Sequence, residues 1–132
     1  MEFGLLVPFL GLSLLATTDL GLALYRKMQV EDAAQAGAQY AIAHGFDAAA
    51  VTNAVASATG SSAISATPAP IHFCGCPTGS GITTATCGSV CSGGANAGTY
   101  TTVYAQGSYS TILDYQIVST YTMNSQATVR LQ

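Results

Sequence analysis

Apolar side chains fill the first stretch of the chain almost without interruption. Most residues from Phe3 to Leu24 are apolar, and Ser13 is the only polar side chain between Phe3 and Thr17. A helix without a polar face lies in a membrane or along the buried axis of a helical assembly. At ~1.5 Å per residue this stretch covers the ~30 Å hydrocarbon core of a bilayer. Pro8 removes one backbone donor, so we expect it to bend the helix without breaking it.

The helical pattern continues through residues 28–45, which are rich in alanine, the best helix former. Small and apolar residues recur at helical spacing on one face. They are Val30, Ala33, Ala34, Gly37, Ala38 and Ala41. Such a stripe lets helices pack at short distance. One continuous helix from about residue 2 to residue 44 would be ~65 Å long. A small globule does not need such a helix, whereas a filament subunit does.

Capping residues predict where this helix stops and a second one starts. Gly45 suits the left-handed C-cap position that ends a helix. Asp47 is suited to be the N-cap of a short helix that ends near Gly60. From Ala63 onward serine, threonine, glycine, proline and β-branched residues replace the helix formers. The second helix is therefore the last one that the pattern predicts.

The remainder of the chain predicts a small sheet. Residues 62–74 can supply one short strand, and residues 74–98 are expected to form a glycine-rich loop without a core. Threonine, tyrosine, valine and isoleucine make residues 99–111 and 115–132 typical strands, joined by a turn at 112–114. We therefore predict an α+β fold with a long N-terminal helix, a short helix and a small antiparallel β-sheet head. Residues 1–45 would form the apolar helix and residues 46–132 the head.

Composition and charge limit the classes of function. Only 7% of the residues are charged, against roughly 25% in a typical soluble domain, and 49% are hydrophobic. A disordered chain would be poor in apolar residues, so the low charge indicates a surface hidden in lipid or against other copies. The net charge is −3, and Arg26, Lys27 and Arg130 are the only bases. A nucleic-acid backbone would find few positive groups, which argues against a nucleic-acid partner.

Four cysteines, Cys74, Cys76, Cys87 and Cys91, follow the spacing C-x-C-x10-C-x3-C. Structural zinc sites usually carry C-x2-C pairs, and no haem attachment motif or C-x-x-C redox motif is present. We therefore predict two disulfides and no metal or other cofactor. A ring that joined Cys74 to Cys76 would be strained, so each bridge should connect the first pair to the second. The sequence leaves both crossing patterns open.

No residue forms a recognisable catalytic arrangement. His44 and His72 are isolated from any serine, aspartate or cysteine at a catalytic spacing, and His44 is expected to interact with the dipole at a helix end. The seven tyrosines lie mostly in the strand region, where they suit sheet packing. We therefore expect no catalytic residues and no enzymatic activity.

Charged residues in and near the apolar helix are the candidate assembly residues. Glu2 precedes the apolar run where a signal peptide would have basic residues. It either marks a membrane interface or pairs with a positive group on a neighbouring subunit. Asp19 has no base within the i+4 reach of helix ion pairs, since Arg26 and Lys27 follow it by ~10–12 Å along the axis. Asp19 either extends to the interface or pairs with one of these bases on the next subunit.

The N-terminal run resembles that of TadE-like pilins of the tight-adherence (Flp) branch of type IV pili. The matching features are Glu2-Phe3, Pro8, the sequence DLGLALY at residues 19–25 and the alanine-rich sequel. The closing SQATVRLQ is also similar to the family's last strand. The resemblance covers residues 1–60 well and residues 100–132 loosely. It does not extend to the cysteine-rich middle.

The resemblance implies a structural pilin that polymerises through its hydrophobic helix into an extracellular filament for surface attachment. In the family, subunits wait in the bacterial inner membrane, lose a short basic leader to a prepilin peptidase and are added by the pilus assembly machinery. Glu2 would then pair with the free amino terminus of a neighbour. Two alternatives are a minor or priming pseudopilin and a single-span membrane-anchored binding module.

The leader also bears on orientation. In the sequence Met1 lies directly before Glu2, so we expect either a mature or trimmed product or a start that differs from the family's. Arg26 and Lys27 follow the span, and by the positive-inside rule they alone would keep the C-terminal part in the cytoplasm. A removed basic leader would reverse this bias and place residues 28–132 outside, where the cysteines can oxidise.

Overall fold

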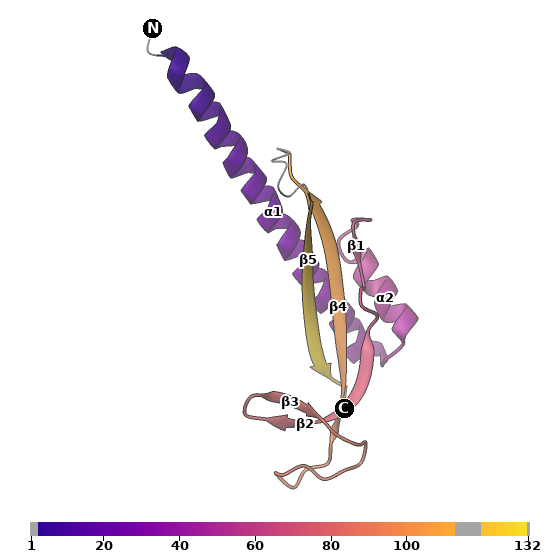
Figure 1. Cartoon of the computed structure of the whole chain (residues 1–132). Coiled ribbons are helices and arrows are strands. Elements are labelled where there is room, and N and C mark those ends of the chain that lie inside the picture. The colour runs from indigo at the N-terminus through magenta and orange to yellow at the C-terminus, as the bar shows by residue number, and fades with distance from the viewer. Residues whose placement is uncertain (1–2, 113–119, 132) are drawn as a thin grey trace.

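Figure 1 shows the computed structural model, which describes residues 3–112 and 120–131. Glu2 and most of the predicted turn at 112–114 lie outside the described residues, as does the start of the last predicted strand. Helix α1 runs from Phe3 to His44 as one helix and continues through Pro8. Gly45 ends it at a φ of 84°, and its N–H donates to the carbonyl of Ala41 at 2.9 Å. The prediction of a single long helix is confirmed.

A short second helix follows at once. Helix α2 spans Ala48–Ser57. Its cap is Asp47, whose side chain accepts a hydrogen bond from the Ala50 N–H at 2.9 Å. Both the second helix and its capping residue match the prediction from sequence.

The head contains one antiparallel sheet with a long central strand. The strands are β1 Ile64–Ser65, β2 Ile71–Thr78, β3 Gly81–Thr84, β4 Gly98–Ser110 and β5 Thr120–Arg130. On one edge β4 pairs with β5 from Tyr100↔Arg130 to Ser110↔Thr120, and on the other edge it pairs with β2 and β1. Strand β3 pairs with β2 alone and forms an outer edge. The predicted α+β class with a small antiparallel sheet is confirmed.

The cysteine-rich middle is more regular than the sequence suggested. Residues 74–98 were expected to form a loop, but β2 extends through Cys74 and Cys76 and turns into β3. Gly75 allows this pairing, because a Cβ there would lie 2.6 Å from the Ile82 Cγ2. The glycine therefore permits a close contact between strands, and the prediction of a loop throughout this segment is wrong.

The small-residue stripe of α1 is buried against the chain's own head. The core joins it to α2 and the sheet, and its buried members are Val30, Ala33, Ala34, Ala38, Ala41, Val51, Val55, Ile64, Val103 and Ala105. At Gly37 a Cβ would lie 2.5 Å from the Val55 Cγ2 and 2.8 Å from the Val103 Cγ1. Small side chains thus bring α1 close to both α2 and β4. The second half of α1 belongs to the core of the head, across the expected boundary at residue 45.

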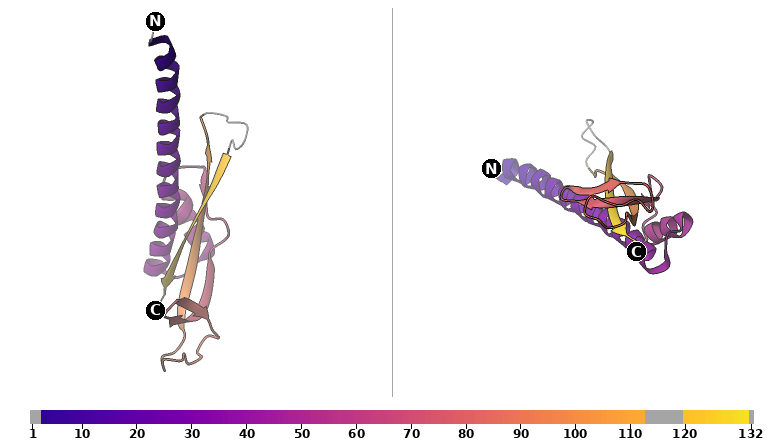
Figure 2. Two further views of the ribbon diagram at one scale, coloured as in Figure 1. Left: turned by 60° about the vertical axis from the view of Figure 1, so that its left-hand side comes forward. Right: turned by 90° about the horizontal axis from the view of Figure 1, so that it is seen from below.

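The part of α1 before Asp19 has no such covering. Figure 2 shows the head beside the C-terminal part of the helix, with the N-terminal part extending beyond it. The β2–β3 hairpin lies at the opposite end of the molecule (Figure 1). The shape is elongated, with an uncovered helix at one end and the disulfide-bonded hairpin at the other.

Candidate functional site

Large apolar side chains cover the projecting half of α1 and contact little else in the chain. Phe3 is 82% exposed and Leu14 is 69% exposed. Also exposed are Leu6, Val7, Phe9, Leu10, Leu12 and Leu15. Among the described residues one helix, taken over Leu6–His44, is long and apolar enough in part of its length to cross a membrane. A patch of this size on a protein surface marks a site covered by lipid or protein.

The apolar surface continues past the point where the head begins. Leu20, Leu22, Leu24, Tyr25 and Met28 are exposed, although they lie at the level of the head. The head covers only one side of α1 here, and these side chains remain uncovered. An apolar ribbon therefore runs along α1 from Phe3 to Met28. We use the name apolar ribbon for the exposed apolar side chains of α1 between Phe3 and Met28.

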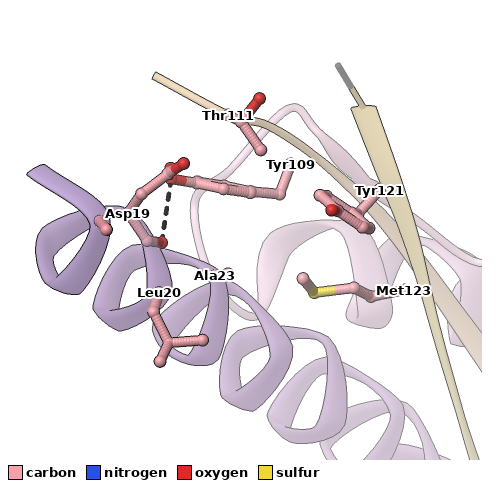
Figure 3. Close-up of a pocket in the computed structure, with 8 residues that line it drawn as sticks. Asp19, Leu20, Ala23, Tyr109, Thr111, Tyr121 and Met123 are labelled. Atoms are coloured by element: carbon pink, nitrogen blue, oxygen red, sulfur yellow. Dashed lines mark hydrogen bonds between the residues drawn. The ribbon is translucent and has the colours of Figure 1, made fainter. Parts of the chain in front are cut away.

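Asp19 is the one charged side chain of α1 that the head buries among the described residues, with 8% of its surface exposed. The Tyr109 hydroxyl donates a hydrogen bond to the Asp19 Oδ1, and also lies 3.3 Å from the Asp19 backbone carbonyl (Figure 3). The Ile112 N–H donates to the same Oδ1 at 3.2 Å. Tyr109 lies near the end of β4, opposite Tyr121 of β5. The tip of the β4–β5 pair is thus bound to the middle of α1.

The Asp19 carboxylate changes the acidity of its partner. It raises the pKa of Tyr109 from 10.0 to about 12, first through the hydrogen bond, then through burial and the repulsion between two negative charges. The phenol therefore stays protonated and donating throughout the physiological range. Sequence reasoning looked for a partner of Asp19 only among bases and missed Tyr109, which lies 90 residues away.

Arg26 and Lys27 have different surroundings, although nothing in the sequence distinguishes these two adjacent bases. The Arg26 Nη1 donates to the Ser61 Oγ at 2.7 Å and to the Gln29 Oε1 at 3.0 Å. Arg26 is half-buried against the head, whereas Lys27 is exposed. Of the other candidate assembly residues, Pro8 lies inside the projecting helix and Glu2 lies outside the described residues.

A pocket of about 390 Å³ opens between α1 and the tip of the β4–β5 pair. Helix α1 contributes Ala16, Asp19, Leu20 and Ala23, and the strands with the residue that follows them contribute Tyr109, Thr111, Tyr121 and Met123. Figure 3 shows Tyr109 reaching Asp19 across the pocket, with Tyr121 and Met123 beside it on the sheet side. The pocket therefore combines apolar and aromatic walls with one carboxylate.

The cysteines lie at the opposite end of the head from this pocket. Cys74 is bonded to Cys87 and Cys76 to Cys91, with Cα–Cα distances of 5.1 and 5.6 Å. Both bridges cross from the first pair to the second, and they fasten the segment after β3 to β2. Within residues 3–112 and 120–131, no group of three or more histidine, cysteine or acidic side chains is placed to hold a metal.

The two histidines contact aromatic rings. His44 stacks on Tyr40 with ring centroids 4.4 Å apart and lies 3.3 Å from the Tyr40 carbonyl. His72 stacks on Phe46 at 5.1 Å. Both are packing contacts between aromatic rings.

Comparison with known proteins finds a family likeness for the N-terminal part of the chain. Residues 1–39 match a family model described as TadE-like protein. This match covers the projecting part of α1, Asp19, Arg26 and Lys27, and part of the buried stripe of small residues. No curated protein and no solved structure matches the chain. The resemblance inferred from the N-terminal residues is therefore confirmed.

Proposed function

We propose that this TadE-like protein of the Tad pilus system is a structural pilin subunit, which polymerises through α1 into an extracellular filament used for surface attachment. The apolar ribbon of α1 is the observation that carries this proposal. The TadE-like family is associated with the pilus and is not a family of enzymes. The role of the chain would then be to assemble into the pilus.

The energetics of the apolar ribbon favour a helix that is always covered. Burying one leucine or phenylalanine side chain contributes ~1.5–3 kcal/mol, and the ribbon exposes many of them. The head covers none of the side chains from Phe3 to Leu15 that the structure describes. Lipid of the bacterial inner membrane would cover the helix before assembly, and other copies would cover it in the filament.

The length of the ribbon favours a polymer over a simple anchor. From Phe3 to Asp19 the helix advances ~24 Å, and from Phe3 to Met28 ~38 Å, against the ~30 Å hydrocarbon core of a bilayer. The tip of the β4–β5 pair binds α1 at Asp19, so it would meet the membrane surface there. A tether alone has no use for exposed leucines beyond that point, whereas a neighbouring subunit can cover them.

The proposal assigns roles to the candidate assembly residues. Five residues would act at contacts between subunits or at the membrane: Glu2, Pro8, Asp19, Arg26 and Lys27. Residues 1–45 would form the filament core and residues 46–132 the outer surface, with the second half of α1 joining the two. Prepilin peptidase and the pilus assembly machinery would be the partners that process and add the subunit. A minor or priming pseudopilin would use the same helix in fewer copies.

Electron microscopy of filaments sheared from cells tests the proposal. We expect filaments in detergent-free preparations, and mass spectrometry of the isolated filaments should identify this chain as their main component. If the chain stays in the membrane fraction as a monomer, it is an anchored module and the proposal is wrong. If it is present only in trace amounts along filaments of another protein, it is a minor pseudopilin.

A further inference from the structure

The pocket beside Asp19 has the chemistry of a receptor for a single basic side chain. We propose that it binds Lys27 of a second copy of this chain, an inference that rests on the proposed polymerisation and specifies one of its contacts. The acceptor is the Asp19 carboxylate, and the walls are the apolar and aromatic side chains around it.

The acceptor combines a buried charge with a place for a long side chain. Among the described residues, the Tyr109 hydroxyl and the Ile112 N–H both donate to the Asp19 Oδ1. The incoming donor would bind at Oδ2. A lysine has four methylene groups below its ammonium, and these can pack on apolar walls such as Leu20. The ring of Tyr121 can attract the ammonium as well. A buried carboxylate without a cation is costly, so the pocket favours a positively charged occupant.

The donor follows from the surroundings of the three bases. Arg26 is bound to its own head through Ser61 and Gln29. The Arg130 guanidinium packs against Gly98 of its own chain, since a Cβ at Gly98 would be 2.9 Å from the Arg130 Nε. Lys27 is exposed and lies at the end of the apolar ribbon. It cannot reach Asp19 of its own chain, because eight residues separate them by ~12 Å along the helix and ~80° around it.

The contact fixes a register between neighbouring helices. A copy displaced by eight residues, or ~12 Å, brings its Lys27 to the level of Asp19. The projecting part of α1 has no polar face, so it presents apolar side chains to the neighbour at any rotation about its axis. Leu12 of one copy then lies level with Leu20 of the other. Leucines at the level of the head would thereby be covered by the projecting half of the neighbour.

The contact also propagates. Donor and acceptor lie on different sides of α1, so each subunit that receives a lysine still presents its own. Such a heterologous contact generates an open helical assembly. A phospholipid headgroup is a poorer occupant, since its phosphate would approach the Asp19 carboxylate in a chain of net charge −3.

Zero-length crosslinking of assembled, full-length protein tests the contact. A carbodiimide joins a carboxylate to an amine only where the two already touch, and Lys27 is the only lysine in the sequence. We expect covalent dimers and longer ladders on a denaturing gel, with an Asp19–Lys27 link found by mass spectrometry. Glu31, four residues after Lys27, can form a link within one chain and reports that the reagent works.

Variants separate this contact from polymerisation as such. Asp19→Asn keeps an acceptor for Tyr109 but lacks the carboxylate, so intersubunit links through Lys27 should vanish and filament yield should fall at least about tenfold. Lys27→Gln should do the same, and Lys27→Arg should recover most of the lost yield without crosslinking. Glu31→Gln is the matched control, since it removes an exposed acid next to Lys27 and should leave ladder and yield intact.

Each outcome supports or overturns the inference. Filaments whose only Lys27 link is to Glu31, or Lys27→Gln filaments at wild-type yield, overturn the lysine contact while polymerisation stands. Recovery of the full-length chain solely as an uncrosslinked monomer from cells and from detergent would overturn both proposals. An intersubunit link through Lys27 that persists in Asp19→Asn would assign Lys27 to another acid and contradict the pocket.

Discussion

The two halves of α1 share one helix but differ in what covers them. From Val30 to Ala41 the face toward the head carries small residues, and α2 and β4 approach it closely enough to bury them completely. From Phe3 to Leu15 the helix carries leucine and phenylalanine, and the head does not reach those side chains that the structure describes. Helix formation alone does not distinguish these halves. Side-chain size does: small residues allow close packing within the chain, and large ones provide area for contacts with other molecules.

The largest effect should come from removing the projecting half altogether. Deleting residues 1–27 removes the Asp19 and Arg26 contacts but no residue of the buried core, whose first member on α1 is Val30. We expect a soluble, folded head that no longer assembles. Circular dichroism, gel filtration and electron microscopy check this. Filaments built from the truncated protein would contradict the assigned role of the apolar ribbon.

A single charge introduced in each half should have opposite consequences. Ala34 is fully buried, so Ala34→Asp strands a charge in the core and should lower the free energy of unfolding of the head by at least ~3 kcal/mol. Leu10 is 62% exposed, so Leu10→Asp should leave the head's stability within ~0.5 kcal/mol while abolishing filaments. Thermal unfolding of detergent-solubilised protein and filament counts separate the two. Equal loss of head stability in both variants would contradict the distinction between a buried and an uncovered part of α1.

A matched pair of glycine substitutions makes the same comparison more finely. In Gly37→Ala the new methyl group meets Val55 and Val103, so we expect a loss of ~1–3 kcal/mol in the stability of the head. In Gly11→Ala nothing lies within 4 Å of the new Cβ, and the better helix former should leave the head unchanged. The unfolding midpoint of each variant gives the result. A stabilised head in Gly37→Ala would show that the core has room that the structure does not.

The smallest effect concerns the junction between the halves, where Tyr109 binds Asp19. The pKa of Tyr109 is raised in the folded protein to about 12, so the folded state holds the proton more tightly than the unfolded chain. The stability from this contact is therefore present below pH ~10 and is lost as the pH rises towards about 12. Ultraviolet titration of the tyrosines should show one late transition. Asp19→Asn should move that transition back towards 10, and an unchanged transition would assign it to another tyrosine.

Local signals explain which parts of the fold the sequence predicts. Gly45 and Asp47 act within a few residues, so they place the end of α1 and the start of α2 correctly. Enrichment in threonine, tyrosine and valine places β4. Strand β2 has no such signal, because it depends on pairing with β4 and on the close approach at Gly75. The stripe of small residues on α1 can be recognised in the sequence. Its packing partners cannot, because only the tertiary fold brings α2 and β4 against it.

The same distinction applies to the candidate site. Asp19 stands out in an apolar helix, so its importance can be read from the sequence. Tyr109 is one of seven tyrosines in the chain, and nothing near it indicates a carboxylate partner 90 residues away. The difference between Arg26 and Lys27 likewise depends on Ser61, which the fold brings beside Arg26. The paired disulfides are similar: spacing limits the crossings to two, and the pairing of β2 with its neighbours selects one.

The central claim is that other copies of this chain cover the projecting half of α1. Electron cryo-microscopy of purified, detergent-free filaments measures this directly, because a helical reconstruction resolves what surrounds each side chain from Phe3 to Thr18. The account predicts that these side chains pack against α1 of neighbouring copies, displaced by ~12 Å along the axis. A filament in which this segment is surrounded by lipid or by a different protein would contradict it.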